Sequence, residues 1–185
     1  MPIANSTDLA NIGKLYLFDG TAFNQIGKVY SNDGTSNYLI YTAEVAMPDL
    51  STPEVYNYLA YNTTASSTSS GYWDLSGCDS LSLSWSLTTT MSWQNAYGLG
   101  STTTVYLKLS DGTTIQLGTK SGTLWTAGTT YSASGTATVN LSGYTDAQLS
   151  KVYLYCTLGG MTASSPVANS DRHSAVASVT NVIAS

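Results

Sequence analysis

A strict alternation of apolar and polar residues between Ser80 and Leu87 most constrains how this chain can fold. Large apolar residues occupy every odd position of the stretch, and serine occupies every even position. Because successive side chains of a β-strand point to opposite faces, the stretch predicts a strand with one face in a core and the other in water. We expect the strand to run from Gly71 to Leu87. A second strand is expected at 151–158, after a similar corner of apolar, Asp or Asn, Leu, Ser and Gly residues.

The composition favours an all-β protein with a packed core. Hydrophobic residues make up 42% of the 185 positions, charged residues only 9%, and 14 residues are tyrosine. Low charge argues against disorder, and Tyr, Thr and Val suit the half-buried surfaces of pleated sheets. Around ten short strands separated by turn signals predict an antiparallel β-sandwich of two sheets, preceded by a small N-terminal segment of β-hairpins.

The N-terminal segment contains an internal repeat with a period of 14 residues. Ile12–Thr21 and Ile26–Thr35 each read Ile-Gly-Lys-x-Tyr-x-x-Asp-Gly-Thr, and Tyr38–Glu44 follows as another strand. Asp-Gly tolerates the positive φ of tight hairpin turns, so the repeat predicts short hairpins. Short two-stranded hairpins are marginally stable, so these must pack on something else. We place the domain boundary after Met47, with an N-terminal segment at 1–47 and a sandwich at 48–185.

This repeat, with Tyr-Leu-Ile-Tyr-Thr-Ala-Glu after it, resembles the N-terminal segment of structural proteins of tailed bacteriophages. The resemblance covers residues 12–44 and implies a virion component, either associated with the tail or decorating the head. It implies docking to other virion proteins, assembly into a homo-oligomer, synthesis in the host cytoplasm and release on lysis. The expected docking residues are aromatic: Tyr16, Phe18, Phe23 and Tyr30. An equally open alternative is that 12–44 extends one sheet of the sandwich.

The two Leu-Ser-Gly corners resemble those of jelly-roll modules of the carbohydrate-binding and galactose-binding-like type. This resemblance covers about residues 55–183 and implies that the sandwich contacts host-surface glycans. It also supports an alternative function, a carbohydrate-binding module of a secreted bacterial protein. A flanking glycosidase domain in the gene would favour that alternative, and neighbouring capsid or tail genes would favour the virion.

Two aromatic-rich loops are the candidate glycan site. Sugars stack their apolar face on an aromatic ring, while amide groups bond their hydroxyls. Residues of both kinds cluster in two stretches: Trp93, Gln94, Asn95 and Tyr97 in one, Trp125 and Tyr131 in the other. The alternative is that the two tryptophans close the ends of the sandwich, since large aromatics usually belong to cores.

Charge and hydropathy argue against two other classes of partner. The net charge is -5 and the six Lys and Arg residues are scattered, so the chain lacks the basic patch that nucleic-acid binding needs. No apolar run approaches the roughly 18 residues of a membrane helix. Residues 1–7 lack the basic start and apolar run of a secretory signal, which fits release by lysis or a trimmed mature protein.

We expect no enzymatic activity, no catalytic residue and no cofactor or metal. His173 is the only histidine and lies in Ser-Asp-Arg-His-Ser, where neighbouring residues cannot converge as a triad does. We expect it in a surface loop. Asp74 and Asp79 are the nearest carboxylate pair, but both flank a turn where Asp caps backbone groups. Cys156 is in phase with the apolar residues of its strand, and its pairing with Cys78 stays open.

Several local expectations complete the analysis. We expect a two-residue hairpin turn at Asp111-Gly112 and a single helical turn at 146–148. Polar loops or connections are expected at 62–71, 88–100 and 121–135. The last strand, 174–183, is expected to close a sheet, with a phase that Asn181 makes ambiguous.

Overall fold

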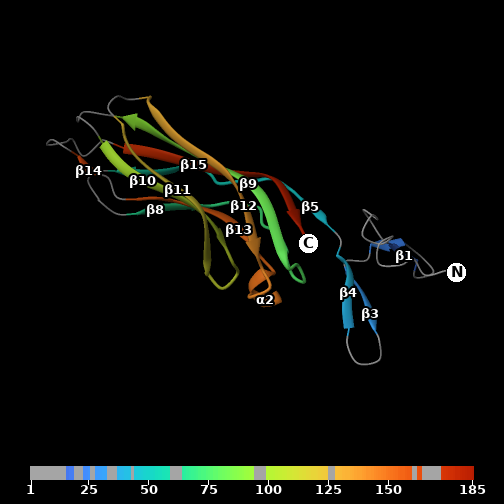
Figure 1. Ribbon diagram of the computed structural model, residues 1–185. Helices are drawn as coiled ribbons and strands as arrows, with labels where there is room; N and C mark the ends of the chain where they lie inside the picture. Colours follow the sequence, from blue (N-terminus) through green and yellow to red (C-terminus); the bar gives the residue numbers. More distant parts are fainter. Residues whose placement is uncertain are drawn as a thin grey trace.

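The computed structural model describes residues 16–18, 23–25, 28–32, 37–42, 44–58, 64–93, 99–124, 128–159, 162–163 and 172–185. Two antiparallel sheets packed face to face contain most of them (Figure 1). The predicted two-sheet antiparallel β-sandwich is therefore confirmed. Of the described residues, one short helix, α2 (Asp146–Leu149), interrupts the strands, at the predicted helical turn.

The smaller sheet has the order β11-β10-β13-β8, and β14 also pairs with β10. Its strands are β8 (Ala65–Thr68), β10 (Leu99–Lys108), β11 (Thr114–Leu124), β13 (Tyr153–Leu158) and β14 (Thr162–Ala163). β8 falls inside the expected 62–71 loop. Its four residues are Ala, Ser, Ser and Thr, so no apolar alternation marks it, and only its backbone pairing with β13 makes it a strand.

The larger sheet has the order β12-β9-β15-β5, and β6 and β7 also pair with β15. Its strands are β5 (Val45–Met47), β6 (Leu50–Ser51), β7 (Val55–Tyr58), β9 (Ser80–Trp93), β12 (Thr130–Asn140) and β15 (Arg172–Ala184). β15 does not close the sheet as expected, because it lies between β9 on one side and three short strands on the other. The ambiguous phase has a physical cause: Asn181 has φ 53, and the register with β9 shifts between Thr180 and Ile183.

The core lies between the sheets and is apolar at the end that carries α2. β9 contributes the expected alternation, with Leu81, Leu83 and Leu87 buried, while Trp85 is half-buried against the same cluster. The neighbouring strand β15 adds Ala175, Ala177 and Val179 from the same sheet. β10 and β13 of the opposite sheet supply the facing residues: Val105, Leu107, Leu154, Cys156 and Leu158. Cys156 is buried as expected, and both it and Cys78 are free thiols.

Two connections are shorter than the sequence suggests, because the neighbouring strands extend further. β9 begins at Ser80, where the alternation starts, rather than at Gly71, and it continues to Trp93, beyond the expected end at Leu87. β11 likewise continues to Leu124. The inward positions of these extensions include polar residues such as Thr89, which is fully buried. The apolar alternation therefore stops while the strand does not.

The hairpin between β10 and β11 is confirmed, with one residue more in its turn. The amide of Leu109 donates to the carbonyl of Thr113, which leaves three residues between them rather than two. Gly112 donates to the Leu109 carbonyl and has φ 91, a left-handed conformation that glycine adopts without steric cost. The Asp111 carboxylate accepts from the amide of Thr113, which fixes the turn.

The described N-terminal strands form two separate two-stranded sheets. β1 (Tyr16–Phe18) pairs with β2 (Phe23–Gln25), and β3 (Lys28–Asn32) pairs with β4 (Asn37–Thr42). Neither pair joins a sheet of the sandwich in the described part of the chain. The next strand, β5, pairs with residues 182–184 of β15. The chain thus enters the sandwich beside its own C-terminus, as Figure 1 shows.

Candidate functional site

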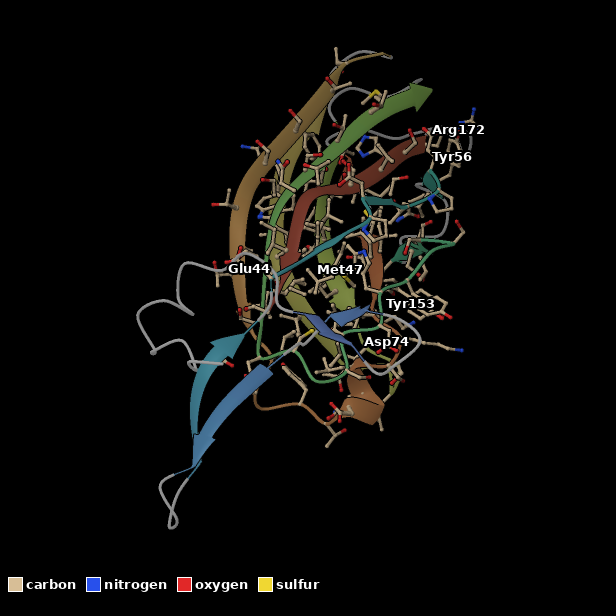
Figure 2. All side chains as sticks on the ribbon, turned by 90° about the vertical axis from the view of Figure 1, so that its right-hand side faces the viewer. Glu44, Met47, Tyr56, Asp74, Tyr153 and Arg172 are labelled. Carbon is tan, nitrogen blue, oxygen red and sulfur yellow. The ribbon has the colours of Figure 1, made fainter. Side chains whose placement is uncertain are left out.

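The end of the sandwich away from α2, here called the loop end, gathers several strand termini. β9 ends there at Trp93, which pairs with Arg172 at the start of β15, and β7 ends there at Tyr58. Hydrogen bonds between Met91 and residues 128–129 hold the start of β12 beside the end of β9. Figure 2 shows Tyr56 and Arg172 at this end and Asp74 toward the other. The Arg172 guanidinium carbon lies 5.2 Å from the centre of the Tyr56 ring.

The predicted glycan loops both begin and end at the loop end. Gln94, Asn95, Tyr97 and Trp125 lie outside the described residues, and so does the side chain of Trp93. The side chains of Tyr16, Phe18, Phe23 and Tyr30 are likewise outside the described part, although their backbones lie in β1, β2 and β3. The assignments of these residues to glycan binding and docking stay predictions.

Tyr131 is the one predicted glycan residue whose side chain the structure describes, and its hydroxyl points between the sheets. The hydroxyl lies 2.9 Å from the Ser101 hydroxyl and donates to the Ser101 carbonyl at 3.2 Å. The half-buried ring covers Gly122, where a Cβ atom would lie 2.6 Å from Tyr131 Cδ1. Glycine at 122 is therefore needed for the close approach of the Tyr131 ring to β11.

Tyr131 belongs to a buried polar cluster that crosses the sandwich below the loop end. The Thr103 hydroxyl lies 3.3 Å from that of Tyr131 and also bonds the hydroxyl of Thr89 on the opposite sheet. The Ser101 hydroxyl lies 2.7 Å from Nδ1 of His173. Buried hydroxyls cost free energy unless they are paired, and these pair with one another across the core.

His173 lies in this cluster rather than in the surface loop that the sequence suggested. It is part of β15, pairs with Met91 and Asn57 of the adjacent strands, and is fully buried. Burial lowers its pKa from 6.5 to about 4, because desolvation disfavours the charged imidazolium. The side chain is therefore neutral at pH 7.

The contact between Ser101 and His173 lacks features of a hydrolytic centre. In a serine triad a carboxylate orients the second ring nitrogen of the histidine. Nε2 of His173 is buried without a hydrogen-bond partner in the described part of the molecule. An imidazole with a pKa near 4 is also a weak base at neutral pH. The other candidate, Asp74, caps its turn as expected: hydrogen bonds from the Ser76 side chain and from the Ser76 amide lower the pKa of its carboxyl group.

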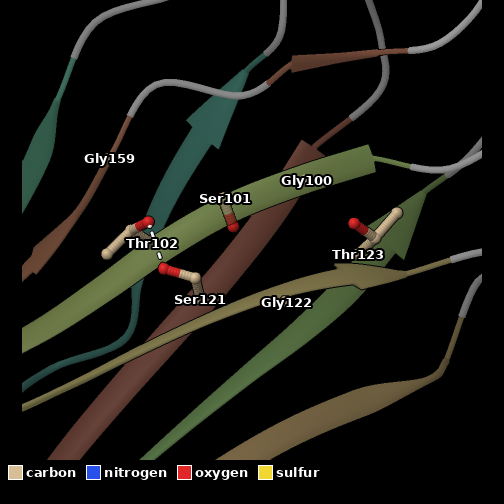
Figure 3. Close-up of a pocket in the computed structure, with 7 residues that line it drawn as sticks. All are labelled: Gly100, Ser101, Thr102, Ser121, Gly122, Thr123 and Gly159. Atoms are coloured by element: carbon tan, nitrogen blue, oxygen red, sulfur yellow. Dashed lines mark hydrogen bonds between the residues drawn. The ribbon is translucent and has the colours of Figure 1, made fainter.

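A pocket of about 530 Å³ opens at the loop end, over β10 and β11 (Figure 3). Its lining is uncharged and consists of hydroxyl residues and glycines: Gly100, Ser101, Thr102, Ser121, Gly122, Thr123 and Gly159. The hydroxyls of Thr102 and Ser121 lie 2.7 Å apart. The exposed backbone and hydroxyls can both donate and accept hydrogen bonds, which suits a neutral ligand rich in hydroxyl groups.

Sequence reasoning missed this pocket because its residues carry no aromatic or charged group. The only signal is the pairing of two short stretches, Gly-Ser-Thr at 100–102 and Ser-Gly-Thr at 121–123, across the hairpin. That signal needs the register, since Ser101 lies opposite Gly122 only once β10 and β11 are aligned. In the described ranges, no group of three His, Cys, Asp or Glu residues is arranged to hold a metal ion, and no helix is long and apolar enough to cross a membrane.

Comparison with known proteins gives distant structural likenesses only. No protein-family model and no curated protein matches the chain. The solved structure of infectious bursal disease virus, Gx strain, matches 92% of this chain and 40% of its own at 16% identity, with a TM-score of 0.44. A structure of the T13 particle of that virus matches 88% of this chain and 37% of its own at 17% identity, also with a TM-score of 0.44.

A third structure, the VP2 subviral particle of the same virus, matches 92% of this chain and 41% of its own at 14% identity, with a TM-score of 0.42. The chain therefore spans about two fifths of the length of the chains that it matches. Likenesses at this level assign neither a family nor a role to the chain.

Proposed function

We propose that this protein is a non-enzymatic structural component of a virus particle, anchored by residues 1–47 and displaying its β-sandwich outward. The observation that carries the proposal is the distance between the end of the sandwich where β5 joins it and the loop end. β5 enters the larger sheet at residues 182–184 of β15, whereas the loop end lies at Arg172. A strand of 13 residues spans about 40 Å, so an anchor at one end leaves the loops at the other free for contact.

The N-terminal strands fit an anchoring role. β1, β2, β3 and β4 form two-stranded sheets of three to six residues per strand, and such sheets are marginally stable alone. Pairing of their edges with another chain would stabilise them, as in β-strand addition. The partners would be other virion proteins and further copies of this chain. A place in the tail or on the head of a tailed phage rests on the sequence resemblance.

Light scattering tests the anchoring role by comparing the full chain with a chain of residues 44–185, which keeps every strand of the sandwich. We expect the full chain to form a larger assembly than 44–185, because only the full chain has the N-terminal hairpins. Circular dichroism and a cooperative thermal transition check that 44–185 is folded. Equal numbers of copies in the assemblies of the two folded proteins would rule out self-assembly through the N-terminal segment.

The loop end supports a second part of the proposal, contact with host-surface glycans. The uncharged hydroxyl pocket lies at the loop end, where the strands that flank the predicted sugar-binding loops begin and end. On a glycan array we expect the full chain to bind neutral glycans, and Trp93→Ala to lower the affinity at least tenfold, or by about 1.4 kcal/mol, with the fold unchanged. Thr138→Ala, on the exposed face of β12, is the control and should bind normally. Undiminished binding by Trp93→Ala would exclude Trp93 from the site.

The glycan array and light scattering together distinguish the virion component from the alternative, a carbohydrate-binding module of a secreted bacterial protein. Strong glycan binding by a chain whose number of copies per assembly does not depend on residues 1–43 would favour the module. A number of copies that does depend on them would favour the virion component, with or without glycan binding.

A further inference from the structure

β12 forms a long free edge of the larger sheet. It pairs with β9 along all its residues, 130–140, without a register shift, and with no other strand that the structure describes. In an antiparallel ladder every second residue directs its N–H and C=O groups away from the neighbour. The free edge of β12 therefore offers unpaired backbone groups over eleven residues.

This edge lacks the features by which proteins block unwanted strand pairing. Natural edge strands are commonly short, interrupted by a bulge, or protected by proline or charged side chains, above all lysine. β12 is eleven residues long, regular, and contains neither proline nor a charged residue. The edge strand of the other sheet differs, because β11 carries Lys120 and a register shift opposite Val105 and Tyr106.

The residues of β12 form a palindrome by chemical type about Gly135. A two-fold axis at Gly135 would bring a second β12 alongside in antiparallel orientation. The pairs would then match in type: Thr130 with Asn140, Tyr131 with Val139, Ser132 with Thr138, Ala133 with Ala137, and Ser134 with Thr136. Hydroxyls would face hydroxyls on the exposed side, as Ser86 faces Ser178 at 2.8 Å within the sheet.

The inward side of β12 is incompletely covered. Ala133, Ala137 and Val139 are only half-buried, although their partners on β9, such as Leu83, are buried. β11 approaches β12 on this side, with Gly122 against the Tyr131 ring and Gly118 against the Trp85 ring, yet the three apolar residues keep some surface in contact with water. A strand added to β12 would cover part of that area as well as pairing the backbone.

We propose that β12 pairs with β12 of a second copy of this chain, antiparallel and centred on Gly135, so that the two larger sheets become one continuous sheet. The contact is isologous, since each copy offers the same residues to the other, and it closes with two-fold symmetry. Eleven paired residues provide about ten backbone hydrogen bonds. The contact is independent of the N-terminal segment and of glycan binding.

Disulfide trapping tests the register in the full chain. Ser134→Cys and Thr136→Cys are made as separate variants, because position 134 of one copy faces position 136 of the other. We expect cross-linked dimers when the two variants are mixed under mild oxidation, and only the wild-type background, which reports Cys78 and Cys156, for each variant alone. Efficient cross-linking of Ser134→Cys by itself would overturn the register, because that requires a two-fold axis at Ser134.

Charged residues introduced at positions 134 and 136 test the contact itself. The full chain with Ser134→Lys and Thr136→Lys places lysine opposite lysine, and we expect the dissociation constant of the dimer to rise more than about tenfold. Ser134→Glu with Thr136→Glu should act in the same way. Mixing the two proteins should restore the wild-type mass, because lysine of one copy then faces glutamate of the other.

Ser82→Lys with Ser84→Lys, on the adjacent strand β9, is the matched control and should keep the wild-type mass. Sedimentation over a concentration series gives all these masses. An unchanged mass for the lysine pair at 134 and 136, or no recovery on mixing, would overturn the contact. Should the N-terminal segment also assemble copies, the lysine pair would halve the mass of the full assembly, whereas deletion of 1–43 would leave the two-fold dimer.

Discussion

At the scale of single residues, the half of the core nearest the loop end depends on hydroxyl groups and one imidazole. Ser101, Thr103 and Tyr131 pair with one another, and Ser101 also pairs with Nδ1 of His173, while Nε2 of His173 has no hydrogen-bond partner in the described residues. Such a cluster stabilises the fold only while His173 is neutral, because a buried imidazolium lacks the solvation that it has in the unfolded chain.

The lowered pKa of His173 predicts how stability depends on pH. In the unfolded chain the imidazole binds a proton near pH 6.5, and in the folded protein it does so only near pH 4. As the pH falls from about 6.5 to 4, the unfolded state gains protons first, so the free energy of unfolding decreases by up to ~3 kcal/mol. Above pH 6.5 this group contributes no pH dependence.

Urea unfolding of wild type and His173→Gln between pH 7.5 and 4 measures this contribution. We expect His173→Gln to be less stable at pH 7.5 but to lose less stability on acidification. The carboxylates with lowered pKa, such as Asp74 and Asp111, titrate in both proteins and cancel in the difference. Parallel pH profiles for the two proteins would contradict a neutral, buried His173.

At the scale of elements, the spacing of the strands around Trp85 depends on two glycines. The indole of Trp85, on β9, lies against Gly118 of β11 and Gly135 of β12. A Cβ atom at Gly118 would lie 2.2 Å from the ring, and one at Gly135 would lie 3.1 Å from it. Glycine at these positions thus lets β11 and β12 close over a tryptophan that larger residues would displace.

Gly118→Ala is therefore expected to destabilise the protein by about 1–3 kcal/mol, because the added methyl group overlaps the Trp85 ring. Gly143→Ala is the control, since a Cβ atom there meets nothing within 4 Å. We expect its stability to stay within about 0.5 kcal/mol of wild type. Denaturant unfolding at neutral pH compares the two. Equal changes in the free energy of unfolding for the two variants would mean that β11 can move away from Trp85 without loss of stability.

At the scale of the whole molecule, the described contacts divide the surface into three regions. The end beside β5 receives the N-terminal segment, the loop end carries the pocket over Ser101, and β12 forms an unpaired edge of the larger sheet. The proposed anchoring, glycan contact and two-fold pairing use different regions, so one protein can carry out all three at once. Variants in one region should leave the other two measurements unchanged.

The sequence by itself determined the fold class and the strongest local elements of this protein. Alternation over 80–87 and 151–158 reports which face of a strand meets apolar neighbours, and this requires nothing beyond the strand itself. Asp111-Gly112 and Thr145–Leu149 were equally local, because a glycine with positive φ and a capping box act within a few residues. These features were therefore predictable.

Only the tertiary structure decided which polar stretches form strands and which polar residues are buried. β8 and the far half of β9 contain hydroxyl residues, which suggest a loop until a neighbouring strand pairs their backbone. The sequence around His173 suggested a surface loop. In the structure His173 is buried because β15 is a central strand and the Ser101 hydroxyl of the facing sheet lies within hydrogen-bond distance of Nδ1. Pairing across the core joins residues 72 positions apart, such as Ser101 and His173, and a local pattern cannot show which distant groups will satisfy each other.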